Sequence, residues 1–210
     1  MSERRLLIDN DAFVLLAGAS FLEEAITAAG FTMAEARRLK SLEFMLRKGA
    51  RAFQKYPAEV ISRSLEMCAR VAPLDEVPNL ATRAAFEKVC GVDEGEAVLY
   101  GVLAEHGFHF LASNDKTAMR AVAGDSRLAA IRGRVAGRVV CMEWLAGRLI
   151  KTHGAALTAQ RFAQLVALDK RLGAILSPAN SGRPEDCLPA AESFLNGLHR
   201  DLGMDFLFTL

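Results

Sequence analysis

The sequence predicts a single α/β domain built around a parallel sheet. Two short apolar runs, LLI at residues 6–8 and FHFLAS at residues 108–113, each lead into an acidic residue, as the carboxyl ends of buried parallel strands often do. Helical apolar patterns fill most of the chain between these runs, and strands that alternate with helices indicate βαβ units. The 210 residues are 51% hydrophobic, which is sufficient for one sizeable core.

The other elements follow in chain order. Thr32 and Glu35 fit a capping box, which predicts a helix with an apolar stripe from Leu39 to Leu46 that ends at Gly49. Pro57 predicts the start of the next helix, which ends before the VAPLDEVP stretch. Further helices are predicted over residues 80–89, 93–106, 158–173 and 188–201, strands over 138–142 and 206–210, and a loop over 177–186.

Composition and charge exclude several classes of protein. The 26 Lys and Arg residues nearly balance 25 Asp and Glu residues, so a preference for a polyanion has to come from local clustering. The four cysteines are widely spaced without a CxxC pair, which predicts reduced thiols and no zinc knuckle. Asp9 and Asp11 interrupt the first apolar stretch, and no run reaches the roughly 18 residues of a membrane span. We therefore expect a cytoplasmic protein without a membrane partner.

Three acidic residues are expected at one edge of the sheet. Asp9 ends the first strand, where it can cap the following helix or point into the crevice in which open α/β sheets bind ligands. Asp115 follows the FHFLAS strand, and Glu96 lies near the start of the helix before that strand. Carboxylates at a helix start commonly serve the helix dipole, so the convergence of the three is what indicates a site.

Glu43 is harder to explain as an isolated residue. It lies within the apolar stripe from Leu39 to Leu46, which predicts a carboxylate on an inward face. A buried unpaired carboxylate costs several kcal/mol, so it requires a cation, a hydrogen-bond network or a raised pKa. The alternative is an ordinary ion pair with Arg38 or Arg47.

Three segments carry a resemblance to the PIN nuclease family. LLIDND resembles the opening strand of PIN domains, whose first acid ends that strand. LEFMLRKGARAFQKYPAEVISRSLEMCARVAPLDE resembles the middle of the toxin ribonucleases of this family, and EAVLYGVLAEHGFHFLASND resembles the region of the third and fourth acids. The resemblance covers about residues 5–120 and carries the family's acids onto Asp9, Glu43, Glu96 and Asp115.

The resemblance implies a three-layer α/β/α fold and departs from the family in three places. We expect a PIN-like domain over residues 1–155 with four or five parallel strands, and a helical extension over residues 156–210 packed on the same domain. Glu96 replaces the more frequent Asp, Asn10-Asp11 replaces a hydroxyl residue and Asn, and the tail is longer than in the compact toxins. The second change falls on residues that would position metal-bound water, and the third suggests an accessory helical element.

The implied function is a divalent-metal-dependent ribonuclease. If the four carboxylates converge, their repulsion would raise some of their pKa values or require cations, and hard oxygen ligands select Mg²⁺ or Mn²⁺. Asp11, Ser113 and Asn114 are candidate auxiliary residues, although turn residues of this kind are common after strands. The resemblance also implies an antitoxin-like protein partner and a homodimer. The candidate RNA contacts are Arg37, Arg38, Lys40, Arg47, Lys48 and Arg51.

Two alternatives belong to other classes. A non-catalytic PIN-like module would bind RNA or protein while its acids form salt bridges. A haloacid-dehalogenase-like phosphatase would use Asp9 as the nucleophile and Asp11 as the acid, and FLAS, ending at Ser113, imitates its second motif. However, Ala12-Phe13 occupies the place of the expected Thr or Val, and no later strand ends in a GDxxxD motif.

Overall fold

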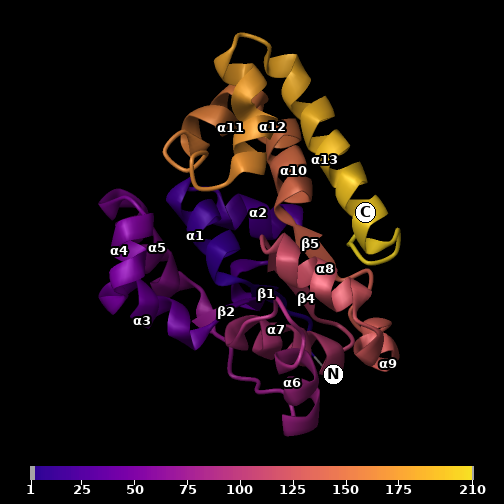
Figure 1. Ribbon diagram of the computed structural model, residues 1–210. Coiled ribbons are helices and arrows are strands. Elements are labelled where there is room, and N and C mark those ends of the chain that lie inside the picture. The colour runs from indigo at the N-terminus through magenta and orange to yellow at the C-terminus, as the bar shows by residue number, and fades with distance from the viewer. Residues whose placement is uncertain (1–2, 210) are drawn as a thin grey trace.

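The computed structural model describes residues 3–209. Five strands form one sheet in the order β3-β2-β1-β4-β5, and every neighbouring pair is parallel (Figure 1). The predicted α/β class is therefore confirmed, and the sheet has the larger of the two predicted strand numbers. The strands are β1 (Leu6–Ile8), β2 (Ala36–Arg38), β3 (Ala72–Pro73), β4 (Phe110–Ser113) and β5 (Val139–Cys141).

Helices connect the strands and follow the last of them. The first four connections contain α1 (Asn10–Gly18), α2 (Leu22–Ala28), α3 (Lys40–Lys48), α4 (Ala50–Lys55), α5 (Ala58–Arg70), α6 (Leu80–Glu87), α7 (Glu94–Glu105), α8 (Lys116–Gly124) and α9 (Ala129–Arg132). The chain ends with α10 (Met142–His153), α11 (Ala155–Phe162), α12 (Lys170–Asn180) and α13 (Cys187–Leu202). The predicted helices after Pro57 and over residues 80–89, 93–106 and 188–201 are confirmed.

The central strand is covered on both faces. Leu6, Leu7 and Ile8 of β1 are all buried, as expected for the middle of a parallel sheet. In this strand order, crossovers of the usual right-handed sense put the helices between β1 and β3 on one face of the sheet and the helices that lead to β4 and β5 on the other. Helix α1 packs against α5, and α7 packs against β4. The arrangement is compatible with three layers.

The C-terminal helices gather at one end of the molecule (Figure 1). Helix α10 packs against α2 and α13, and α13 also contacts α8. The extension over residues 156–210 therefore touches a helix that follows β4 through α13, and Arg161 of α11 pairs with Glu24 of α2, a helix that follows β1. Within residues 3–209, every helix is too short or too polar to span a bilayer.

The segment after Thr32 differs from the prediction. The capping box is present, with Glu35 Oε2 accepting the Thr32 N–H at 2.8 Å, but it closes a single 3₁₀ turn over Met33–Glu35. Strand β2 follows, and the helix begins only at Lys40. The sheet accommodates Arg38 because its buried guanidinium donates to the carbonyls of Cys68 at 3.0 Å and Val71 at 3.1 Å. These acceptors lie about 30 residues away in sequence, so a local pattern gives no sign of them.

Three predictions in the last third of the chain are also wrong in part. The predicted helix over residues 158–173 is interrupted between α11 and α12, because Asp169 Oδ1 caps α12 by accepting the N–H groups of Arg171 and Leu172 at 2.9 and 3.0 Å. Helix α12 continues to Asn180, so the first part of the predicted loop is helical. Of the predicted strand over 206–210, Leu207 forms one bridge to Val139, and residue 210 lies outside the described residues.

Candidate functional site

The candidate site lies at the carboxyl ends of β1 and β4, where the strand order reverses. From β1 the chain moves outward to β2 and β3, and it then returns to β4 and β5 on the other side. Open α/β sheets bind their ligands in the crevice at such a reversal. Asp9 follows β1 directly, and Asp115 follows β4 after Asn114. Both acids are therefore at the edge of the sheet at which their positions in the sequence predicted them.

Asp9 is a buried carboxylate held by three hydrogen bonds. Its Oδ1 accepts the backbone N–H of Asp11 at 2.8 Å, and its Oδ2 accepts the Ser113 hydroxyl at 3.0 Å and the Asn114 backbone N–H at 2.8 Å. Burial raises the pKa of Asp9, and the hydrogen bonds from Asn114 and Asp11 oppose that effect only in part. Asp9 thus caps α1 and is fixed to the end of β4 at the same time.

Ser113 connects Asp9 to Asp115. Its Oγ donates to Asp9 Oδ2 and accepts the backbone N–H of Asp115 at 3.1 Å. The Asp115 carboxylate caps α8, because Oδ1 accepts the N–H of Ala118 at 2.8 Å. The predicted auxiliary role of Ser113 thus has a structural counterpart, which is to hold both acids in one turn.

Glu96 shares the charge environment of these two acids. It forms a capping box with Asp93, in which Glu96 Oε2 accepts the Asp93 N–H at 2.8 Å. Burial raises the pKa of Glu96 to about 8, and the negative charges of Asp115, Asp93 and Asp9 add to that effect against the hydrogen bond from Asp93. The structure therefore brings Glu96, Asp9 and Asp115 within electrostatic reach of one another.

Tyr100 belongs to the same cluster and was not identified from the sequence. It is 1% exposed, its hydroxyl has no hydrogen-bond partner within residues 3–209, and it lies one helical turn after Glu96. Burial raises the pKa of Tyr100 well above its usual value, and the charges of Glu96, Asp9 and Asp115 raise it further. The spacing of four residues from Glu96 was the available signal, but an aromatic residue in an apolar helix is usually part of the core.

Replacing Tyr100 with Phe is expected to increase the free energy of unfolding by about 1 kcal/mol, because the change removes a buried hydroxyl without a partner. The matched control is Tyr56→Phe, which removes a hydroxyl that donates to Asp11 Oδ1 at 2.6 Å and should destabilise the protein. Urea denaturation in EDTA measures both variants. A Tyr100→Phe variant as unstable as Tyr56→Phe would contradict the structure around Tyr100.

The cluster lacks a protein cation. Within residues 3–209, none of Asp9, Glu96 and Asp115 forms an ion pair with Lys, Arg or His, and Lys55, with its Nζ 2.9 Å from Asp11 Oδ2, pairs with Asp11 instead. No three His, Cys, Asp or Glu side chains in this part of the chain are already arranged to hold a metal ion. The donor set nevertheless fits Mg²⁺ or Mn²⁺ in kind, because it consists of carboxyl oxygens that form no ion pair with a side chain of the described residues.

The structure does not join Glu43 to the other three acids. Glu43 lies in the first turn of α3, 39% exposed, and forms ion pairs with Arg38 Nη2 at 3.1 Å and Arg47 Nη2 at 3.0 Å. Its charge acts on the Cys68 thiol, whereas the charges that act on Glu96 come from Asp115, Asp93 and Asp9. The ion pairs are the alternative that the sequence left open, and the role of Glu43 as a fourth ligand stays a prediction.

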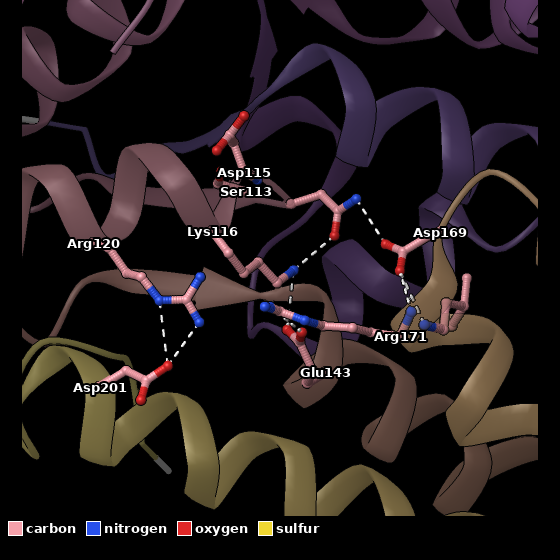
Figure 2. A network of polar contacts seen from close by, with 10 residues as sticks. Ser113, Asp115, Lys116, Arg120, Glu143, Asp169, Arg171 and Asp201 are labelled. Atoms are coloured by element: carbon pink, nitrogen blue, oxygen red, sulfur yellow. Dashed lines mark hydrogen bonds and ion pairs between the residues drawn. The ribbon is translucent and has the colours of Figure 1, made fainter. Parts of the chain in front are cut away.

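A partly buried polar network connects the end of β4 to the C-terminal helices (Figure 2). Asn114 Nδ2 donates to Asp169 Oδ2 at 2.8 Å, and Lys116 Nζ donates to Asn114 Oδ1 at 2.7 Å. Lys116 also forms a buried ion pair with Glu143 at 3.1 Å, and Arg171 lies 3.5 Å from the other Glu143 oxygen. Because the Asn114 N–H donates to Asp9, the contacts that fix Asn114 also help to fix the Asp9 carboxylate. Lys116, Glu143 and Asp169 were not identified from the sequence.

The six predicted RNA contacts differ in side-chain exposure and in the partners that they already bind. Arg38 is buried, Arg37 donates to the carbonyls of Ala34 and Ala36, and Arg47 pairs with Glu43. Lys40 lies 3.6 Å from Asp75 in an exposed ion pair. Lys48 and Arg51 are exposed and form no ion pair within residues 3–209.

Comparison of the chain with protein-family models, with curated proteins and with solved structures found no match.

Proposed function

We propose that this chain is a divalent-metal-dependent nuclease of the PIN type that hydrolyses RNA phosphodiester bonds. The observation that supports this best is the group of Asp9, Glu96 and Asp115, three carboxylates without a cationic partner within residues 3–209, two of which, Asp9 and Asp115, raise the pKa of the third, Glu96. Such repulsion is relieved by a hard divalent cation. The position of the group at the reversal of strand order also supports a ligand site.

Asp9, Glu96 and Asp115 are the proposed ligands of Mg²⁺ or Mn²⁺, which when bound would neutralise phosphate charge and activate a water molecule. The residues of the chain prepare this chemistry. Ser113 and Asn114 hold the Asp9 carboxylate in one orientation, and a cation at the cluster would favour the ionised form of Glu96. The unpartnered Tyr100 hydroxyl is available to donate a hydrogen bond to an oxygen in the cluster.

The basic α3–α4 segment is the proposed contact for the RNA backbone. It carries the exposed Lys48 and Arg51, and its end is connected to the acidic edge, because Lys55 and Tyr56 both contact Asp11. Asp11 in turn donates its backbone N–H to Asp9. An RNA backbone held on α3 and α4 would therefore lie next to the carboxylates. Its phosphate groups and the carboxylates repel one another, so a cation would be needed between them.

Purified protein is tested on mixed labelled RNA with Mn²⁺ or Mg²⁺, with and without EDTA. We expect cleavage only with metal, and a rate about 100-fold lower in Asp9→Asn and Asp115→Asn, since each removes a charge that the metal site requires. Glu43→Gln is the matched control, because it removes a carboxylate that Arg38 and Arg47 already neutralise. This variant is expected to stay within about threefold of the unchanged protein.

Circular dichroism and thermal unfolding establish that each variant is folded. Cleavage in EDTA, or full activity in Asp9→Asn, would overturn the nuclease proposal. RNA binding without cleavage under any metal condition would instead identify the non-catalytic module, and a phosphoenzyme at Asp9 would identify the phosphatase.

A further inference from the structure

A pocket outside the acidic cluster lies between α8, α12 and α13. Its volume is about 340 Å³, and its lining includes Arg120 from α8, Arg171 from α12, and Phe194, Arg200 and Asp201 from α13. We call it the arginine pocket. Figure 2 shows Arg120 directed toward Asp201, with Arg171 extending from α12. The pocket is in the size range of small-molecule sites.

One guanidinium group in the arginine pocket binds the carboxylate of Asp201, and the charges of two more act on it. Asp201 Oδ2 accepts from Arg120 Nη2 at 2.6 Å and from Arg120 Nε at 3.3 Å. The hydrogen bond from Arg120 lowers the pKa of Asp201, and the positive charges of Arg120, Arg171 and Arg200 lower it further. The pocket therefore carries more positive than negative charge. Planar guanidinium groups in this arrangement suit the bidentate recognition of a phosphate.

Within residues 3–209, Glu143 is the one other carboxylate that pairs with an arginine of the pocket, and it does not remove the excess of positive charge. Arg171 lies 3.5 Å from Glu143 Oε1, but Glu143 is already paired with the buried Lys116 at 3.1 Å. Arg200 forms no ion pair in the part of the chain that the structure describes and is exposed. An incoming anion would therefore meet at least one guanidinium that has no competing partner.

Phe194 gives the pocket a second kind of recognition. It is 37% exposed, and it lies on α13 in the lining that also contains Arg200 and Asp201. An accessible aromatic face next to cationic side chains is the combination with which proteins stack a nucleic-acid base and hold its phosphate. An inorganic anion would use only the arginines, whereas a nucleotide would use both features.

We propose that the arginine pocket binds a nucleotide, with the phosphate on Arg120 and Arg200 and the base stacked on Phe194. The nucleotide is either free or a unit of a single strand. The binding site is distinct from the carboxylates of Asp9, Glu96 and Asp115 and does not depend on the nuclease proposal. Helix α8, which begins directly after Asp115, joins the two regions.

Binding is measured with the full chain in EDTA, so that no metal-dependent cleavage occurs. The probe is a fluorescent single-stranded oligoribonucleotide with 2′-O-methyl riboses, followed by anisotropy, and AMP and inorganic phosphate serve as competitors. Arg200→Ala is expected to weaken the binding of oligonucleotide and AMP about tenfold, as for the loss of one charged hydrogen bond. Asp201→Asn is expected to strengthen both, because it removes the competing carboxylate.

Phe194→Ala separates the two parts of the proposal. This variant is expected to lower the affinity for AMP about fivefold or more and to leave competition by inorganic phosphate unchanged, because only the base stacks on the Phe194 ring. Equal affinity for AMP and oligonucleotide identifies a free nucleotide as the source of the phosphate, and tighter binding of the oligonucleotide identifies a strand.

The matched control is Arg134→Ala, which makes the same charge change at an exposed position outside the pocket. If Arg134→Ala and Arg200→Ala weaken nucleotide binding equally, the effect comes from net charge alone and the proposal is overturned. Weaker binding in Asp201→Asn, or unchanged AMP affinity in Phe194→Ala, would also overturn it. Thermal unfolding of each variant establishes that a loss of binding does not come from a loss of folding.

Discussion

Replacing Lys116 with Met is expected to lower the free energy of unfolding by about 3 kcal/mol. The Lys116 and Glu143 side chains are 8% and 2% exposed, and Nζ lies 3.1 Å from Oε2. Removal of the lysine leaves the Glu143 charge in the interior with Arg171 as its remaining cation, at 3.5 Å. Breaking one side of a buried ion pair costs far more than the pair contributes, because the other charge stays desolvated.

Urea denaturation measures this effect, and Lys151→Met is the matched control. Lys151 forms an ion pair with Glu192 at 3.5 Å in which both side chains are more than half exposed, so its removal should cost less than about 1 kcal/mol. Adding Glu143→Leu to Lys116→Met should restore most of the loss, since it removes the stranded charge. Equal stability of the Lys116→Met and Lys151→Met variants would show that the pair is not buried.

The second large effect concerns the pH dependence of stability. Burial raises the pKa of Glu96 to about 8 in the folded protein, whereas the unfolded chain releases this proton near the ordinary value of 4.5. Between these values the folded state binds more protons, so the free energy of unfolding contributed by Glu96 falls as pH rises. The loss is complete above about pH 8. Because Glu96 is partly open to solvent, which screens the repulsion, we expect about 2 kcal/mol.

Glu96→Gln isolates this contribution from other titrating groups, such as His109, whose lowered pKa acts in the opposite direction. Glutamine keeps the capping box with Asp93, so the variant should match the unchanged protein near pH 4.5 and exceed its stability by about 2 kcal/mol near pH 8.5. Urea denaturation in EDTA across this range gives both curves. Glu94→Gln, on the same helix but exposed, is the control. Parallel curves for Glu96→Gln and the unchanged protein would contradict the raised pKa.

The sequence predicted the elements whose signals are local. Strands β1 and β4 each combine an apolar run with a following acid, and α5, α7 and α13 have a clear start or an apolar face. Strand β2 was missed because ARR resembles a basic helix, and its burial depends on the distant carbonyls of Cys68 and Val71. The interruption between α11 and α12 was missed because Asp169 was not identified as a cap.

The same distinction applies to the site. Asp9 and Asp115 could be predicted because the ends of parallel strands meet at one edge, and Glu96 because its helix precedes β4. Glu43 lies on a helical stripe, but Arg38 reaches it from β2, a strand that the sequence did not predict. Asp169 contacts Asn114 across 55 residues, and Lys116 pairs with Glu143 from another helix. Contacts of this kind follow from tertiary packing, which a single sequence does not display.

The central claim is that Asp9, Glu96 and Asp115 together require a cation. Calorimetric titration of Mn²⁺ into the metal-free protein near neutral pH tests it most directly, with Asp9→Asn, Asp115→Asn and Glu43→Gln titrated in parallel. We expect binding by the unchanged protein, affinity at least about tenfold lower in the first two variants, and unchanged affinity in Glu43→Gln. Equal affinity in Asp9→Asn, Asp115→Asn and the unchanged protein would contradict the claim.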